Sequence, residues 1–184
     1  MAEMDGETSA PSRVFESLAG FTKIVVTGPQ RSGTTICANM IAHDLGLPCV
    51  DERGVTPFWL KDRGKTISRI KAKLRENRLV LQSPSAAAFC HELPANVAVV
   101  YMIRPVEDII KSQQRINWDG NPFELMMLEV DSGESCVLKY ERWKWQKPLI
   151  KHAFEVEYES LKAHPLWVDA ELRKNFTAKQ IRVQ

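Results

Sequence analysis

The sequence predicts an α/β fold of three layers, in which helices cover both faces of a mainly parallel sheet of about five strands. Short, apolar and β-branched runs alternate along the chain with segments whose apolar residues recur at helical spacing. The runs carry few polar residues, which indicates strands that are buried on both sides. Ligands of such sheets bind beyond the carboxyl ends of the strands, so function is expected there.

The predicted elements follow from these patterns in chain order. Strands are predicted over residues 23–27, 47–50, 78–82, 96–103 and 153–158, and helices over 34–45, 65–76, 83–93, 106–116, 137–150 and 160–176. Gly46 stands where the first helix should end, and Ser83 and Pro84 stand where the third should begin. Pro148 should end or kink the fifth helix.

The composition is typical of one soluble globular domain. The chain has 184 residues, of which 44% are apolar and 26% charged, and this is enough to bury a core. Residues 1–12 are small and polar and are predicted to form a flexible N-terminal tail, and residues 13–184 a single domain. No stretch is apolar enough for a signal peptide or a membrane span, so no membrane partner is expected.

The distribution of cysteines and of basic residues argues against some classes of function. The four cysteines include no CxxC pair, which fits a cytoplasmic location, and neither they nor the four histidines indicate a metal site. The basic run 61–78 is interpreted as a solvated helix face, so a nucleic-acid partner is not expected. Tyr140, Trp143 and Trp145 either pack a helix on the sheet, which we favour, or stack on a bound ring.

A glycine-bounded loop, "GPQRSGTT", follows the first strand and opens the first helix. Gly28 and Gly33 have the spacing of a P-loop, whose backbone N–H groups converge on one anion. The helix that begins at Thr34 adds the partial positive charge of its N-terminus. We therefore predict a P-loop fold with an anion site here, and consider a purely structural turn the weaker alternative.

The cation of this loop is displaced from its usual position. Thr34 stands where P-loop nucleotide triphosphatases carry a lysine, and Thr35 stands where they carry a magnesium-binding hydroxyl. A neutral threonine cannot bridge two phosphates. The positive charge is instead supplied by Arg31, inside the loop.

A second candidate anion site follows the strand predicted over 96–103. Arg104 stands at the end of that strand, and Ser112 is eight residues further on, one turn beyond Asp108 on the same predicted helix face. Arg104 and the Ser112 hydroxyl can then share an anion. The alternative, that Arg104 is a structural partner of Asp108 or Glu107, stays open.

Three stretches, "GPQRSGTT", "YMIRPVEDIIKS" and "FEVEYESLKAHP", resemble in this order the motifs of sulfotransferases that use 3′-phosphoadenosine 5′-phosphosulfate (PAPS). The resemblance implies PAPS as co-substrate, no required metal, and transfer of a sulfuryl group to a hydroxyl or amine. Arg104 and Ser112 would bind its 3′-phosphate. The 5′-phosphosulfate would be bound by the loop residues Gly28, Arg31, Ser32, Gly33, Thr34 and Thr35.

The resemblance also indicates the catalytic residues. Arg31 would stabilise the transferring group, because sulfuryl transfer spreads negative charge over several oxygens. Glu52 lies seventeen residues after Thr35, similar to the distance of a catalytic glutamate in tyrosylprotein sulfotransferases, and would be the general base. Alternatively, Glu52 pairs with Arg53 or is solvated.

Several positions depart from the sulfotransferase pattern. Pro105 is shifted by one place, Gln82 replaces a cation after the third strand, and Asn175 replaces a glycine near the C-terminus. Gln82 and the short chain favour, as one alternative, a non-catalytic nucleotide-binding module. Another alternative is a divergent kinase, because residues 28–52 also resemble small-molecule kinases, although Thr34 stands at the lysine position. The sequence indicates neither the acceptor nor the oligomeric state.

Overall fold

The computed structural model describes residues 15–55, 62–76, 78–116 and 135–169. The predicted tail, residues 1–12, lies outside the described residues, as does Asn175. None of the described helices is long and apolar enough to cross a membrane.

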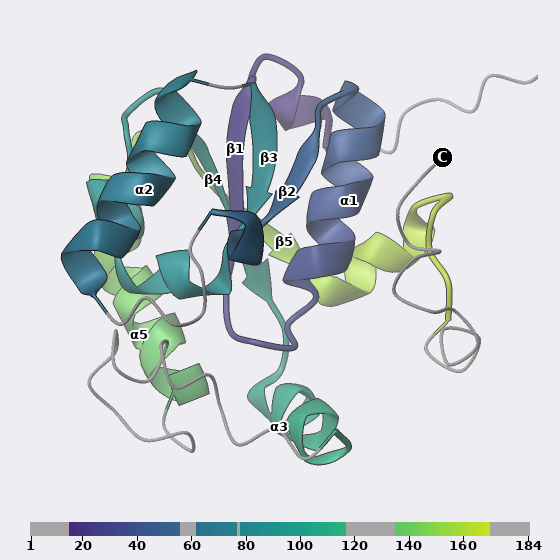
Figure 1. Cartoon of the computed structure of the whole chain (residues 1–184). Helices are drawn as coiled ribbons and strands as arrows, with labels where there is room; N and C mark the ends of the chain where they lie inside the picture. Colours follow the sequence, from purple (N-terminus) through teal and green to yellow (C-terminus); the bar gives the residue numbers. More distant parts are fainter. Residues whose placement is uncertain (1–14, 56–61, 77, 117–134, 170–184) are drawn as a thin grey trace, which may run out of the picture.

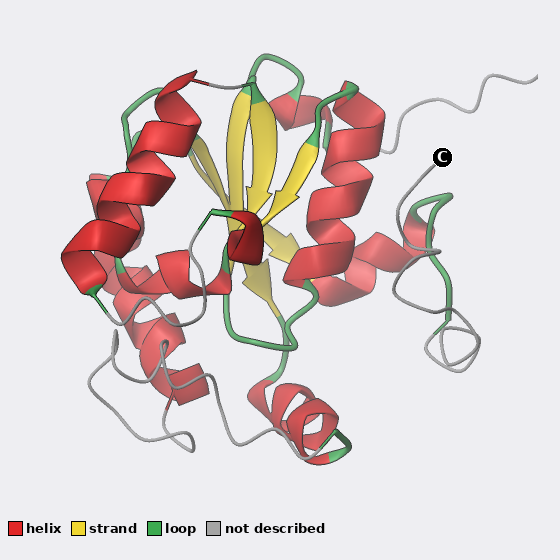
Figure 2. Cartoon of the chain, in the orientation of Figure 1, coloured by secondary structure: helices red, strands yellow, loops and turns green. Residues whose placement is uncertain are grey.

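A five-stranded, wholly parallel sheet forms the centre of the molecule (Figure 2). The strand order is β2-β3-β1-β4-β5. The strands are β1 (Lys23–Thr27), β2 (Cys49–Asp51), β3 (Leu79–Gln82), β4 (Ala98–Ile103) and β5 (Ala153–Glu157). All five carboxyl ends therefore lie at one edge of the sheet, called the carboxyl edge below, and the central strand β1 places the glycine-bounded loop there.

Helices cover both faces of the sheet, which confirms the predicted three-layer α/β fold (Figure 1). On one face α1 (Thr34–Leu45) packs its buried residues Cys37, Met40 and Ile41 over the strands. The opposite face is covered by α2 (Arg63–Glu76) and by α5 (Ser135–Gln146), whose Trp143 is buried against the sheet. Trp143 stacks on Tyr101 of β4, with ring centroids 4.3 Å apart, so the packing role predicted for it is confirmed. The packing role predicted for Trp145 is wrong, because its side chain is 59% exposed.

Shorter elements complete the described chain. The helix α3 (Val106–Gln114) follows β4 at the carboxyl edge, with Asp108 in its first turn as predicted. α5 ends before Pro148, as predicted, and Pro148 lies in a 3₁₀ turn. The 3₁₀ segments are η1 (Glu16–Leu18), η2 (Glu52–Gly54), η3 (Pro84–Ala88), η4 (Cys90–Glu92), η5 (Lys147–Leu149) and η6 (Tyr158–Ala163).

The α-helix predicted over 83–93 is wrong, because this segment forms two 3₁₀ turns, η3 and η4, and Ser83 makes no side-chain capping hydrogen bond. The cause is the side-chain amide of Gln146 on α5. Its Nε2 donates to the carbonyl of Ala87 at 2.8 Å, and its Oε1 accepts from the backbone N–H of His91 at 3.2 Å. In an α-helix these two backbone groups would bond to each other, so the inserted amide breaks the ladder.

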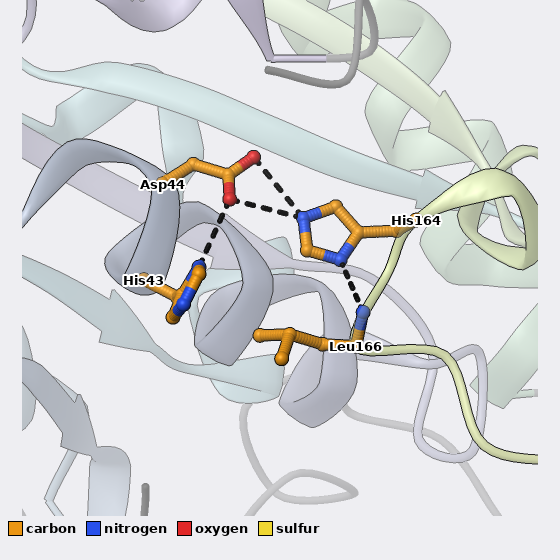
Figure 3. Close-up of polar contacts among 4 residues, drawn as sticks. All are labelled: His43, Asp44, His164 and Leu166. Carbon is orange, nitrogen blue, oxygen red and sulfur yellow. Dashed lines mark hydrogen bonds and ion pairs between the residues drawn. The ribbon is translucent and has the colours of Figure 1, made fainter. Parts of the chain in front are cut away.

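The α-helix predicted over 160–176 is also wrong within the described residues. The segment η6 ends at Ala163. The next residue, His164, has an extended backbone (ψ 138°) because it precedes Pro165. The His164 side chain is buried, its Nε2 donates to the carboxylate of Asp44 on α1 at 3.1 Å, and its Nδ1 accepts from the N–H of Leu166 (Figure 3). This contact ties the chain after β5 to the last turn of α1.

Candidate functional site

The loop between β1 and α1 has the backbone of an anion-binding turn. Three of its residues have positive φ, namely Gly28 at 141°, Arg31 at 72° and Gly33 at 101°. A Cβ on Gly33 would lie 2.6 Å from Cδ2 of Tyr158, so both conformation and space require glycine there. Arg31 adopts a left-handed conformation that is costly for a side chain, which is characteristic of functional sites.

Gln82 pairs with Thr34 at the position where the expected lysine is missing. Thr34 is only 4% exposed, and its Oγ1 accepts a hydrogen bond of 3.1 Å from Nε2 of Gln82 at the end of β3. Thr34 and Gln82, which both stand where a cation was expected, are thus joined by a hydrogen bond between neutral groups. The loop carries its positive charge at Arg31 instead.

The two anion sites predicted from the sequence adjoin each other. Nε of Arg31 donates to Oγ of Ser112 on α3 at 3.2 Å, and Nη1 of Arg104 donates to the Arg31 carbonyl at 2.8 Å. Nε2 of Gln113 adds a third link, to the carbonyl of Gln30 at 3.2 Å. The loop and the β4–α3 junction thus form one continuous surface.

No acidic side chain in the described ranges forms an ion pair with Arg31 or Arg104. Asp108 instead pairs with Lys111 on its own helix, with Nζ and Oδ1 3.9 Å apart. The alternative in which Arg104 is the structural partner of Asp108 therefore has no support in the structure.

Repulsion among arginines is a feature of this surface. Burial lowers the pKa of Arg31, and the neighbouring charges of Arg115 and Arg104 lower it further, while Tyr158 acts in the opposite direction. Arg115 is the C-cap residue of α3 and belongs to no motif that could have indicated its place beside Arg31. An anion bound among these guanidinium groups would relieve their repulsion, so the surface favours an anionic ligand.

Two tyrosines position Arg104. Its guanidinium carbon lies 4.1 Å from the centre of the Tyr158 ring, a cation–π contact. The hydroxyl of Tyr140 accepts from the Arg104 N–H at 2.9 Å and donates to its carbonyl at 2.8 Å. Burial raises the pKa of Tyr140 to about 12, so this hydroxyl stays protonated. Nε of Arg104 is buried and has no hydrogen-bond partner among the described residues.

The Tyr140→Phe variant tests this positioning. The ring is retained, but two backbone groups of Arg104 lose their partner, which should lower the free energy of unfolding by about 1–3 kcal/mol. The control is Trp145→Phe on the same helix, where the side chain is 59% exposed, and its effect should stay within about 0.5 kcal/mol. Urea denaturation measures both variants, and equal effects would contradict the role of the hydroxyl.

Glu52 lies in η2 and its carboxylate faces the segment after β3. Its Oε2 accepts from the backbone N–H of Ser85 at 3.4 Å. The hydroxyls of Ser32, Ser83 and Ser85 are buried and have no hydrogen-bond partner among the described residues. No sequence motif indicated a binding role for Ser83 or Ser85, and the role of Glu52 as a base stays a prediction.

Comparisons with known proteins identify the fold. No protein-family model matches the chain, and no curated protein matches it. Shikimate kinase from Acinetobacter baumannii, solved with shikimate, is 21% identical, with 79% of this chain and 88% of that chain covered and a TM-score of 0.46. The YorR protein from Bacillus subtilis, solved with phosphorylated GDP, is 14% identical, with 83% and 92% covered and a TM-score of 0.50.

The chain thus has a three-layer P-loop α/β fold, as the strand order, the loop and the similarity to YorR together show. The P-loop fold is therefore confirmed, and the finer resemblance to sulfotransferases stays a prediction.

Proposed function

We propose that this chain binds a nucleotide that carries two separate anionic groups, one on the loop and one at Arg104 and Ser112. The observation that carries the proposal is the direct contact between these regions, with Arg31 Nε 3.2 Å from Ser112 Oγ and Arg104 bonded to the Arg31 carbonyl. A single ligand can therefore touch both regions. The phosphorylated GDP bound to YorR, which shares the fold, supports a nucleotide as the ligand.

PAPS is the ligand that we propose among nucleotides of this kind. Its 5′-phosphosulfate would lie on the loop, where Arg31 and the backbone N–H groups stabilise charge on the transferring group. Its 3′-phosphate would accept from the guanidinium of Arg104, which forms no ion pair among the described residues. Glu52 would take the proton of an acceptor hydroxyl or amine as the acceptor oxygen or nitrogen bonds to sulfur and the sulfur–phosphate oxygen bond breaks.

Phosphoryl transfer by a divergent kinase is the second candidate function. The fold that the chain shares with YorR favours it, and the carboxylate of Glu52 at the end of β2 is compatible with it. The residues of the loop argue against a kinase. Thr34 stands where a kinase has its phosphate-bridging lysine, and it is hydrogen-bonded to Gln82. A kinase of this kind would need Arg31 to replace that lysine.

Calorimetric titration separates these functions. We expect adenosine 3′,5′-bisphosphate, without metal, to bind at least about tenfold more tightly than ATP with magnesium, a difference of about 1.4 kcal/mol. Tighter binding of ATP with magnesium would favour the kinase and contradict PAPS. Binding of neither ligand would contradict a nucleotide site altogether.

A further inference from the structure

A cavity of about 710 Å³ opens beside the anion site, at the carboxyl ends of β4 and β5 and against α5. Its volume lies in the range of small-molecule sites. Its walls are mainly apolar and aromatic, formed by Ile103, Val106, Val137, Tyr140 and Trp143. Such walls suit a flat, uncharged group rather than a phosphate.

Arg104 and Tyr158 belong to both the cavity and the anion site. Both side chains line the cavity, while Arg104 also donates to the carbonyl of Arg31 at 2.8 Å. A ligand whose phosphate contacts Arg104 therefore has its neighbouring atoms at the cavity entrance.

Most of the charged side chains that line the cavity are acidic, and the basic ones are Arg104 and Lys144. Four of the lining residues are exposed carboxylates, namely Glu141, Glu155, Glu157 and Glu159. Three of them pair with lysines, as Glu155 does with Lys147 at 2.9 Å, and no ion pair is found for Glu157 within the described ranges. Carboxylates repel phosphates but accept hydrogen bonds from N–H groups, which nucleobases carry.

The strand order separates the cavity from Glu52. The loop follows the central strand β1, Glu52 follows β2 on one side, and the cavity lies beyond β4 and β5 on the other. A nucleotide whose phosphates occupy the loop can extend into the cavity without covering the carboxylate that would face an acceptor.

We infer that this cavity binds the nucleoside part of the nucleotide, with the base between Val106, Val137 and Tyr140 and its N–H donors toward the carboxylates. The inference rests on the proposed function, because it assigns the phosphates to the loop and to Arg104. It implies that the arginines and the carboxylates together fix the direction in which the nucleotide lies.

Filling the cavity tests the inference. Val137 is 51% exposed on α5 and lines the cavity, so Val137→Trp places an indole there at little cost to folding. We expect the affinity for adenosine 3′,5′-bisphosphate to fall at least about tenfold, and the affinity for inorganic pyrophosphate to stay within about twofold. Val106→Trp, which enters from α3, should act in the same way.

The control is Leu149→Trp, at a side chain that is 58% exposed and does not line the cavity. It should change neither affinity, and thermal unfolding followed by circular dichroism checks that all three variants fold. Wild-type affinity for the bisphosphate in both Val137→Trp and Val106→Trp would overturn the inference and leave the proposed function intact. If the wild-type protein binds neither the bisphosphate nor pyrophosphate, the proposed function fails and the inference fails with it.

Discussion

Replacing Arg104 by alanine is expected to weaken binding of adenosine 3′,5′-bisphosphate roughly 30- to 1,000-fold, or by about 2–4 kcal/mol. The guanidinium lies over Tyr158 and is the group that we assign to the 3′-phosphate. Binding of 5′-AMP should weaken less than about threefold, because that ligand has no 3′-phosphate to lose a charge-assisted hydrogen bond. Calorimetric titration of both ligands measures the two effects.

Lys111→Ala is the matched control for Arg104→Ala. It removes a positive charge from α3, but the side chain is 74% exposed and already pairs with Asp108. Binding of either ligand should stay within about twofold of wild type, since exposed charges contribute little. Equal losses for the bisphosphate and AMP in Arg104→Ala would mean that Arg104 acts only by shaping the loop through the Arg31 carbonyl, and the 3′-phosphate assignment would be wrong.

The second large effect is expected on stability, in the His164→Ala variant. The imidazole is 1% exposed, bonds to Asp44 through Nε2 and packs on Phe15, with ring centroids 5.7 Å apart. Its removal opens a cavity and leaves a partly buried carboxylate without this donor, which should cost about 3 kcal/mol. A domain of this size should then melt roughly 6–12 °C lower.

His43→Ala is the corresponding control. His43 contacts the same carboxylate, at 3.1 Å, but its side chain is 48% exposed. Its loss should change the free energy of unfolding by less than about 0.5 kcal/mol. If the two variants were equally destabilised, the contact between His164 and Asp44 would not be what ties the chain after β5 to α1.

The strands and most helices could be predicted because their signals are local. Ile24, Val25 and Val26 of β1 are apolar and buried, and α1 begins directly after the glycine-bounded loop. The segment after Ser83 could not be predicted, because its conformation depends on the amide of Gln146, 55 residues from His91 in the chain. A local pattern contains no information about such an insertion.

The same distinction holds for the candidate site. Arg31, Arg104 and Ser112 could be predicted to lie at the carboxyl edge, because their motifs follow predicted strands. The contact between Arg31 and Ser112 could not, since it depends on β1 and β4 being neighbours in the sheet. The contributions of Tyr140 and Arg115 could not be predicted either, since they depend on where α5 contacts the residue after β4 and on where α3 ends. Residues that belong to no motif, and that contribute only because the fold places them near the site, can be identified only from the structure.

The most direct test of the two-anion site is the ³¹P NMR spectrum of adenosine 3′,5′-bisphosphate, free and bound to the wild-type protein without metal. The chemical shift of the 5′-phosphate should change when that group binds to the loop, and the chemical shift of the 3′-phosphate should change when that group binds to Arg104 and Ser112. We expect both resonances to shift on binding, and the shift of the 3′-phosphate to be lost in Arg104→Ala. A shift of the 5′-phosphate alone in the wild-type protein would contradict the account.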